Sequence, residues 1–393
     1  MDIFEKCFAY QDARMAQAAG LYPYFLPLED TEGTEVVVDG RRVLMIGSNN
    51  YLGLTTDPRV RQAAVDATKR YGTSCTGSRF LNGTLRIHQE LEARLASYVG
   101  KPASLVFSTG YQTNLGTISC LVHRGDVVVA DKDDHASIVD GCMLALGELR
   151  RFSHNDLEHL DRVLGGIDPK SGRMVVVDGV YSMGGDLAPL PQLIEVCKAH
   201  GARLMVDDAH SLGVMGRGRG TAAHFGVTDD VDLIMGTFSK SFASLGGFIA
   251  GDADVVHYIQ HHARALIFSA SMPASNVAAV MAALEIMENE PDRVDRLWAV
   301  TERMRTGLRR LGFNMGPSVT PVIPIITGDV ATTILAWKKC FEAGLYTNPV
   351  LAPAVPPDEC LLRTSYMATH SDEQIDRALD ILGTVGRELD LIQ

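Results

Sequence analysis

Lys240 is the residue whose neighbours in the sequence best suit it to covalent chemistry. It stands in Gly236-Thr-Phe-Ser-Lys-Ser241, among hydroxyl side chains, and follows by thirty-three residues Asp207, which ends a strand-like apolar run. An isolated lysine is usually a solvated surface residue. Here apolar segments on both sides predict that the amine lies at the edge of the core, where burial lowers its pKa and makes it first a nucleophile and then a base.

An amine, an acid and hydroxyl groups are what pyridoxal phosphate requires of a protein. Lys240 could form an imine with the cofactor aldehyde, Asp207 could keep the pyridine nitrogen protonated, and the hydroxyls could bind phosphate. Asp207 has an alternative interpretation as the N-cap of a helix, a common position for an aspartate after a strand. Taken together, the residues favour a pyridoxal phosphate enzyme.

Two histidines and a glycine turn extend this pattern. His210 lies three residues after Asp207 and is either a structural histidine or a donor to the phenolic oxygen of the cofactor. His135 follows another strand-like run, where a flat imidazole could stack on a flat cofactor. The segment Ser108-Thr-Gly-Tyr-Gln-Thr-Asn114 predicts a turn that opens a helix, whose backbone amides and dipole can bind a phosphate.

Short apolar runs separated by helical segments would position these residues. The runs are 104–109, 126–130, 174–178, 203–207 and 232–236, and they predict buried parallel strands. Helices are predicted between them, for example over 85–99 and 190–200, each followed by a glycine. This alternation indicates an α/β fold with a mostly parallel sheet, in which ligands bind at the carboxyl ends of the strands.

The pattern changes after about residue 280. Long amphipathic segments cover 276–311, with a break near Pro291, and 330–343, and β-like residues 320–326 separate them. Ser371-Asp-Glu-Gln374 forms a capping box that begins a terminal helix. We therefore expect an N-terminal segment over 1–45, a large cofactor-binding domain over 46–280 and a smaller α+β domain over 281–393.

Composition indicates a cytoplasmic enzyme that acts on small molecules. The chain has 393 residues, of which 46% are hydrophobic, and its net charge of -12 disfavours binding to nucleic acid. Seven cysteines without a Cys-x-x-Cys pair suit a reducing compartment. No targeting sequence or transmembrane segment is predicted.

No metal site is predicted either. His257 and His261 lie four residues apart, but no carboxylate or cysteine accompanies them as a third ligand.

Several motifs together resemble the α-oxoamine synthases, which are pyridoxal phosphate enzymes of the aspartate-aminotransferase fold (type I). The motifs are Asn49-Asn-Tyr-Leu-Gly-Leu54, Asp134-His-Ala-Ser-Ile-Val-Asp-Gly141, Asp207-Asp-Ala-His-Ser-Leu-Gly213 and Gly236-Thr-Phe-Ser-Lys-Ser241. The resemblance covers nearly the whole chain. It departs at Asp208, where a glutamate is common, but this second position of the acid pair is not the partner of the pyridine nitrogen.

The resemblance implies a role for each of several residues. Lys240, His135 and Asp207 would be catalytic: Lys240 forms the imine, Asp207 pairs with the pyridine nitrogen, and His135 stacks on the ring and helps to hold the substrate carboxylate. Further cofactor contacts would come from Gly110, Tyr111, Ser182, His210, Thr237, Ser239 and, from the partner subunit of a homodimer with shared active sites, Ser269. Substrate contacts would come from Asn49 and Arg363.

The resemblance also implies the reaction, which is a decarboxylating condensation of an amino acid with an acyl thioester carried by coenzyme A or a carrier protein. Three motifs resemble those of the family members that use L-serine and a long acyl chain. They are Gly77-Ser-Arg-Phe-Leu-Asn-Gly-Thr84, Phe238-Ser-Lys-Ser241, and Leu362-Arg-Thr-Ser-Tyr-Met-Ala-Thr-His370 following Ala354-Val-Pro-Pro357. Use of alanine or glycine with another acyl donor is the alternative, and an aminotransferase on the same fold is a second.

Overall fold

The computed structural model describes residues 2–393, and the chain divides into two compact units. The large unit comprises Asn49–Trp298 with Val319–Pro321, and the small unit comprises Met1–Ser48, Ala299–Ser318 and Val322–Gln393. The expected domain limits near residues 45 and 280 stay a prediction. Each unit is described by itself below.

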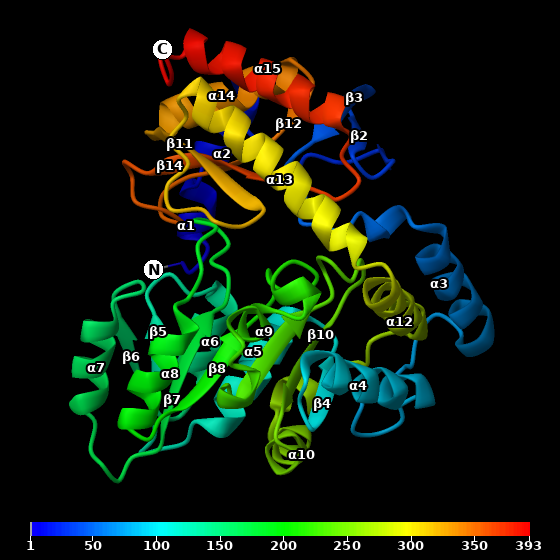
Figure 1. Cartoon of the computed structure of the whole chain (residues 1–393), viewed down its shortest axis with the longest axis vertical. Coiled ribbons are helices and arrows are strands. Elements are labelled where there is room, and N and C mark those ends of the chain that lie inside the picture. The colour runs from blue at the N-terminus through cyan, green and yellow to red at the C-terminus, as the bar shows by residue number, and fades with distance from the viewer. Residues whose placement is uncertain (1) are drawn as a thin grey trace. The chain divides into compact units, whose positions relative to one another are not determined.

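A seven-stranded sheet forms the centre of the large unit (Figure 1), with the strand order β4-β10-β9-β8-β7-β5-β6. The strands are β4 (Ala103–Phe107), β5 (Val127–Asp131), β6 (Glu148–Phe152), β7 (Arg173–Asp178), β8 (Arg203–Asp207), β9 (Leu233–Thr237) and β10 (Gly247–Gly251). Only β10 runs antiparallel to its neighbours, β4 and β9, so the sheet is mostly parallel as predicted.

Helices cover both faces of this sheet (Figure 1). The helices of the large unit are η1 (Leu54–Thr56), α3 (Pro58–Tyr71), α4 (Arg86–Val99), α5 (Gly110–Leu121), α6 (Ala136–Leu144), α7 (Leu157–Gly165), α8 (Leu190–Ala199), η2 (Gly216–Gly218), α9 (Thr221–Phe225), η3 (Thr228–Asp230), α10 (Ala253–His262), α11 (Arg264–Ile267) and α12 (Ala274–Asn289). Each residue of β5 and of β9 is buried, which explains why the apolar runs predicted these strands.

Two smaller sheets belong to the small unit, with the orders β1-β2-β3-β12 and β11-β14-β13. Their strands are β1 (Asp30–Thr31), β2 (Glu35–Val38), β3 (Arg41–Met45), β11 (Val322–Gly328), β12 (Leu345–Tyr346), β13 (Asn348–Val350) and β14 (Cys360–Ser365). The helices are α1 (Glu5–Ala9), α2 (Asp12–Ala18), α14 (Val330–Glu342) and α15 (Asp372–Glu388), while α13 (Asp292–Leu311) continues from the large unit.

Local sequence signals set several helix ends. Gly100 follows α4 with a φ of 71°, a left-handed conformation that glycine adopts without strain. At the start of α15 the Ser371 hydroxyl accepts from the Gln374 amide at 3.2 Å, while the Ser371 amide donates to the Gln374 side chain at 3.1 Å, which is the predicted capping box. The predicted break near Pro291 separates α12 from α13.

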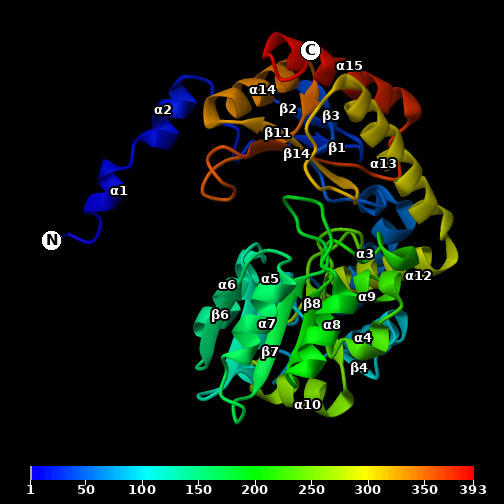
Figure 2. The same ribbon diagram turned by 60° about the vertical axis from the view of Figure 1, so that its left-hand side comes forward.

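The first two helices expose most of their surface. Figure 2 shows α1 and α2 projecting from the rest of the small unit, and neither contains a buried residue. Within residues 2–393, no helix has both the length and the apolar character needed to cross a membrane.

Candidate active site

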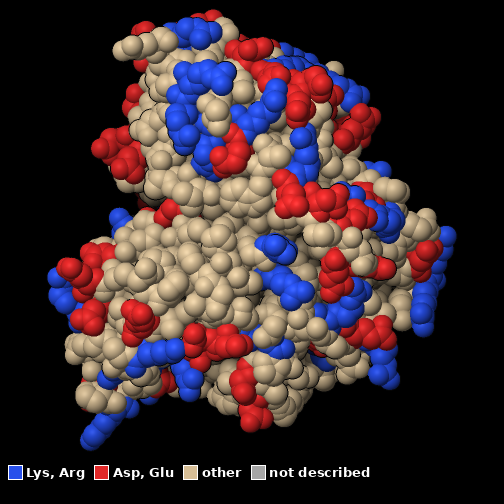
Figure 3. Space-filling model, in the orientation of Figure 1, with Lys and Arg blue, Asp and Glu red and all other residues tan. Residues whose placement is uncertain are grey.

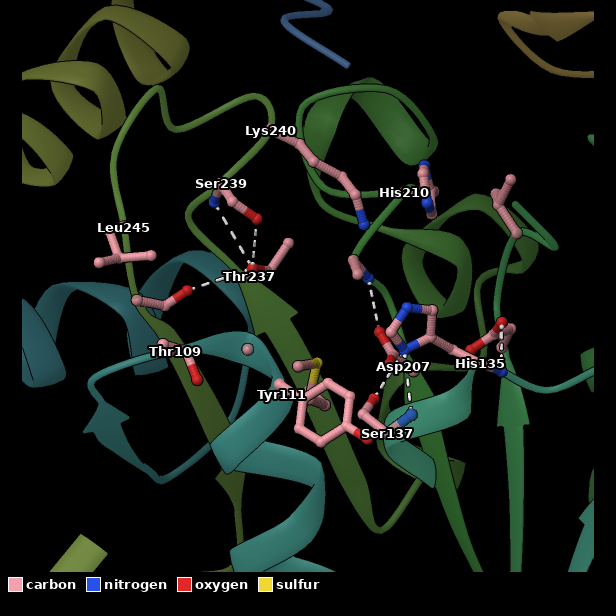
Figure 4. Close-up of a pocket in the computed structure, with 16 residues that line it drawn as sticks. Thr109, Tyr111, His135, Ser137, Asp207, His210, Thr237, Ser239, Lys240 and Leu245 are labelled. Carbon is pink, nitrogen blue, oxygen red and sulfur yellow. Dashed lines mark hydrogen bonds between the residues drawn. The ribbon is translucent and has the colours of Figure 1, made fainter. Parts of the chain in front are cut away.

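A cavity of about 300 Å³ lies in the large unit, where β7, β8 and β9 end and α5 and α6 begin. Figure 4 shows the side chains that line it. Eight of the predicted site residues are among them, namely Gly110, Tyr111, His135, Asp207, His210, Thr237, Ser239 and Lys240. They span 131 positions of the sequence and meet because parallel strands present their carboxyl ends at one edge of the sheet.

Lys240 lies on the turn that follows β9 and is half-buried. Phe238 and Phe242, both fully buried, hold the turn on either side, and the Ala243 amide closes it on the Lys240 carbonyl oxygen at 3.0 Å. Ala243 has a φ of 54°, a conformation that L residues rarely adopt. In Figure 4 the Lys240 amine points into the cavity, toward Asp207 and His135.

The carboxylate of Asp207 is held at the end of β8 with only 4% of the residue exposed. One oxygen, Oδ1, accepts the Ala209 amide at 2.9 Å, and the other, Oδ2, accepts from Asn114 Nδ2 at 2.7 Å. Asn114 is fully buried in α5 and also donates to the Ser137 hydroxyl at 2.9 Å. These bonds fix the plane of a carboxylate that could accept a ring N–H.

His135 caps the N-terminus of α6 with its side chain. Its Nδ1 lies 2.7 Å from the Ser137 hydroxyl, and its backbone amide donates to Asp178 Oδ2 at 3.2 Å. Burial lowers the pKa of His135, because a charged imidazole would lose its hydration there. The neutral ring can therefore lie against an aromatic ligand without adding a positive charge.

His210 is buried and hydrogen-bonded. Its Nδ1 lies 2.8 Å from the hydroxyl of Tyr51, a residue of the first family motif. Tyr51 is itself almost fully buried, so the pair fixes the imidazole plane beside the cavity.

Hydroxyls and a helix N-terminus gather at another part of the cavity. Gly110 begins the twelve-residue helix α5, and the Thr109 side chain caps it by accepting the Gln112 amide at 3.0 Å. Thr237 Oγ1 lies 2.9 Å from the Ser239 hydroxyl and donates to the carbonyl of Gly246 at 3.1 Å. A Cβ on Gly110 would lie 2.6 Å from Thr237 Oγ1, so only glycine allows the helix to begin this close to the strand.

This arrangement fits pyridoxal phosphate. The close approach at Gly110 brings free backbone amides and two hydroxyls together, which is what a phosphate group requires. The fixed carboxylate of Asp207 would hold the ring nitrogen, and the Lys240 amine would react with the aldehyde. The roles of these residues stay predictions, but their placement in one cavity is observed.

Asp178 is a lining residue that the sequence did not single out. It ends β7 directly beside Asp207, with the two Cα positions paired across parallel strands, and only 4% of it is exposed. Burial, with the nearby charge of Asp207, raises the pKa of Asp178 well above its usual range. The sequence contains a signal for Asp178, because this aspartate ends an apolar run in the same way as Asp207 ends the next run.

Asn114, Tyr51 and Ser137 were also missed. Each supports a predicted residue from a distant part of the chain, and the Tyr51–His210 pair, for example, is separated by 159 positions. No local pattern marks such a partner, although Tyr51 lies inside a motif that carried the resemblance.

Four predicted residues lie outside the cavity lining. Ser182 is half-buried in the turn after β7, and Asn49, also half-buried, stands at the start of the large unit. Arg363 is buried on β14 of the small unit. Ser269 accepts a 3.0 Å hydrogen bond from Gln112 in the first turn of α5 of the same chain. The proposed contacts of all four stay predictions.

The segment 77–84 packs against the segment that carries Ser269. Ser78 and Ala270 form an isolated β-bridge, and the Ser271 amide donates to the Gly77 carbonyl at 2.9 Å. Arg79, buried beside Glu92 at 2.8 Å, anchors the same segment to α4. The motif therefore positions residues 269–271 next to α5.

Comparison with known proteins identifies the family. The family model of aminotransferase class I and II matches residues 41–382. A serine palmitoyltransferase of Sphingobacterium spiritivorum is 50% identical over 95% of this chain and 94% of its own length. An 8-amino-7-oxononanoate synthase of Symbiobacterium thermophilum is 41% identical over 98% of this chain and 99% of its own.

Solved structures agree with the curated relatives. A serine palmitoyltransferase with pyridoxal phosphate superimposes with a TM-score of 0.96, at 36% identity, over the full length of both chains. The expected fold, a type I aminotransferase fold with a mostly parallel sheet and a smaller domain, is confirmed. The chain belongs to the aminotransferase class I and II family and, within it, to the pyridoxal-phosphate-dependent α-oxoamine synthases.

Proposed function

We propose that this chain binds pyridoxal 5'-phosphate and is a serine palmitoyltransferase. It would condense L-serine with a long-chain acyl thioester such as palmitoyl-coenzyme A, releasing 3-ketosphinganine, coenzyme A and carbon dioxide, as the first step of sphingolipid synthesis. The observation that carries the proposal is the meeting of Lys240, Asp207, His135 and His210 around one cavity. The 50% identity to a relative named for this reaction supports the choice of substrates.

Each residue has a task that follows from its chemistry. When bound, pyridoxal phosphate supplies a ring that accepts the electron pair left at the α-carbon of the amino acid. Lys240 Nζ removes the proton from that carbon and later returns a proton to it. The Asp207 carboxylate keeps the ring nitrogen protonated, and Asn114 holds the carboxylate in place at 2.7 Å.

His135, His210 and the hydroxyl groups bind and orient. The neutral imidazole of His135 would lie against the ring and bind the substrate carboxylate, for which Arg363 would be a second partner. His210, fixed by Tyr51 at 2.8 Å, would bind the phenolic oxygen of the cofactor, with Ser182 as a further contact. Gly110, Tyr111, Thr237 and Ser239 would bind the phosphate, and Asn49 would contact the substrate.

A panel of substrates tests the reaction. Coenzyme A release would be measured for serine, alanine and glycine, each with palmitoyl, pimeloyl and acetyl thioesters. We expect the highest kcat/KM for serine with palmitoyl-coenzyme A. A preference for alanine with the pimeloyl donor would instead identify an 8-amino-7-oxononanoate synthase, which relatives at 41% identity favour as the second candidate.

Replacing Lys240 by alanine tests the assignment of the catalytic lysine independently of the choice of substrates. K240A should bind the cofactor without the visible absorption band of the wild-type holoenzyme and should lose turnover by at least about a thousandfold, because both the covalent attachment and the base disappear. Retention of turnover by K240A would refute the assignment whatever the preferred substrate is.

We also propose a homodimer with shared active sites, in which Ser269 of the partner subunit helps to bind the phosphate. Exposed apolar side chains support an interface on the large unit, including Met143, Leu144, Leu245 and Phe268. On the face seen in Figure 3, a broad part of this unit carries no acidic or basic side chain. Light scattering coupled to gel filtration should give twice the mass of 42.6 kDa.

A cytoplasmic location completes the proposal. The seven cysteines are all unbridged in the structure, and five of them are buried, as suits a reducing compartment. Fractionation of cells should recover the protein with the cytosolic enzymes.

A further inference from the structure

His154 lies at the outer end of a group of buried acids that reaches the cavity. It follows β6, whereas Asp131 is the last residue of β5 and Asp186 follows β7; these three strands are neighbours in the sheet (Figure 1). His154 Nδ1 lies 3.1 Å from Asp131 Oδ1, and His154 Nε2 lies 2.8 Å from Asp186 Oδ2. The imidazole therefore joins the loop after β5 to the loop after β7.

The two short distances determine the charge of the imidazole. Carboxylate oxygens only accept hydrogen bonds, so each ring nitrogen must carry a proton to bond its partner, and the ring is an imidazolium. Its surroundings are otherwise acidic or uncharged, with Asp133 at 3.7 Å and the Tyr181 ring in edge contact at 4.3 Å. The two carboxylates raise the pKa of His154 to about 10 against the opposing effect of burial.

Asn155 closes the same arrangement from the backbone. Its amide donates to Asp131 Oδ2 at 2.9 Å, and its side chain donates to Asp186 Oδ2 at 3.0 Å. Asn155 has a φ of 53°, a left-handed conformation in which asparagine is more frequent than most residues. His154 and Asn155 thus each bond the carboxylates of both Asp131 and Asp186, and these four residues form a clamp.

Backbone hydrogen bonds connect this clamp to the cavity. The Asp131 amide donates to Asp134 Oδ2 at 2.9 Å, and the Asp178 amide donates to Asp134 Oδ1 at 2.9 Å. Asp178 in turn accepts the His135 amide at 3.2 Å. An unbroken series of hydrogen bonds thus connects Asp131 through Asp134 and Asp178 to His135, which lines the cavity, so a displacement of Asp131 would disturb His135.

We infer that His154, clamped between Asp131 and Asp186, is a positioning residue that fixes His135 and Asp178 for binding of the cofactor ring. This inference rests on the proposed cofactor binding and adds a residue that touches neither cofactor nor substrate. Removing the imidazolium leaves two carboxylates facing each other without the cation between them, so the loops after β5 and β7 separate and His135 loses its fixed orientation.

The test compares His154→Gln with His200→Gln. His200 is a matched control, because its Nε2 lies 2.8 Å from Asp161 and its side chain is 21% exposed, against 23% for His154, but it precedes β8, at the opposite end of the strands from the cavity. Each purified apo-protein would be titrated with pyridoxal phosphate, and the visible circular dichroism of the bound cofactor would be recorded. Far-ultraviolet circular dichroism would check the fold.

For H154Q we expect a cofactor Kd raised about tenfold or more and a weakened visible circular dichroism band, since the group that holds the ring is no longer fixed. H200Q should match the wild type in both. If H154Q only unfolds at a lower temperature, with the Kd and visible band of the wild type, His154 is merely structural and the inference is wrong.

A second variant decides the question if H154Q does not fold. Asp186→Ala removes the acceptor of one arm of the clamp and keeps the His154–Asp131 contact, so a Kd raised about threefold is expected, and a wild-type Kd and visible band would overturn the inference. Failure of the wild-type protein to bind pyridoxal phosphate would refute the proposed function itself, which distinguishes the two failures.

Discussion

Asp178 and Asp207 are adjacent buried carboxyls that line the same cavity. Both are almost fully buried and face the same cavity from paired positions on β7 and β8. Two carboxylates so placed repel each other, and the pKa of Asp178 is raised by burial and by Asp207. The raised pKa favours the neutral form of Asp178, so we assign to Asp207, which Asn114 and the Ala209 amide hold, the role of partner for a protonated ring.

Replacement by asparagine should therefore preserve activity at Asp178 but not at Asp207. Asparagine keeps an oxygen that can accept the His135 amide, so D178N should retain kcat/KM within about threefold, whereas D207N should lose about a thousandfold with the loss of its charge. Steady-state kinetics and a cofactor titration of both variants measure this. An equally large loss in D178N would mean that Asp178 works as a carboxylate.

The sequence predicted the residues that carry a local signal. Lys240 and Asp207 follow apolar runs that are buried strands, and strand ends converge at one edge of a parallel sheet. Their supports, Asn114 and Tyr51, have no such signal, because the contact partners lie 93 and 159 positions away. Reactive residues could thus be predicted where they follow a strand, whereas the residues that hold them in place could not.

At the level of elements, the start of α5 against β9 shapes the phosphate end of the cavity. In Gly110→Ala, the new Cβ would lie 2.6 Å from Thr237 Oγ1 and 2.9 Å from Thr237 Cβ, so the helix must shift. We expect a destabilisation of about 1–3 kcal/mol from overpacking and a weaker cofactor affinity, measured by chemical denaturation and by titration.

Gly165→Ala, in helix α7, is the control for Gly110→Ala. Gly165 ends α7, and its Cβ would meet only His200 Cε1 at 3.6 Å, an ordinary contact. G165A should be neutral or stabilise by up to about 1 kcal/mol, because alanine is the better helix former. Equal effects of G110A and G165A would show that the close approach at Gly110 is unimportant.

Two strands of the seven-stranded sheet were not predicted, for opposite reasons. In β6 the residues Glu148-Leu-Arg-Arg-Phe152 are mostly polar and partly exposed, because β6 is an edge strand that pairs with β5 alone. In β10 the residues Gly247-Phe-Ile-Ala-Gly251 are fully buried, but they are few, begin and end with glycine and lie close to the Lys240 turn, so no separate strand was predicted. Pairing with distant strands makes both segments β-structure.

Across the whole molecule, two histidines, the buried His88 and the partly buried His154, give the free energy of unfolding an opposite pH dependence on either side of about pH 6.5. Burial lowers the pKa of His88 to about 4, so the unfolded chain binds this proton more tightly and stability rises with pH up to the ordinary histidine pKa. His154 has its pKa raised to about 10, so the folded chain keeps its proton and stability falls as pH rises above 6.5.

The fall between pH 6.5 and 8.5 should therefore depend on His154. One proton corresponds to at most about 1.36 kcal/mol per pH unit, and partial exposure of the pair reduces this, so we expect a loss of about 1–2 kcal/mol over the interval. The interval ends at pH 8.5 because the thiols of the unfolded chain begin to ionise at that pH, whereas burial raises the pKa of four thiols in the folded chain to about 12. These are Cys120, Cys142, Cys197 and Cys340.

Urea unfolding at several pH values measures this slope. The wild type and H200Q should show it, whereas H154Q should be less stable at pH 6.5 and its free energy of unfolding should change little up to pH 8.5. A wild-type slope in H154Q would place the responsible proton elsewhere, because only the group that keeps a proton on folding can produce it.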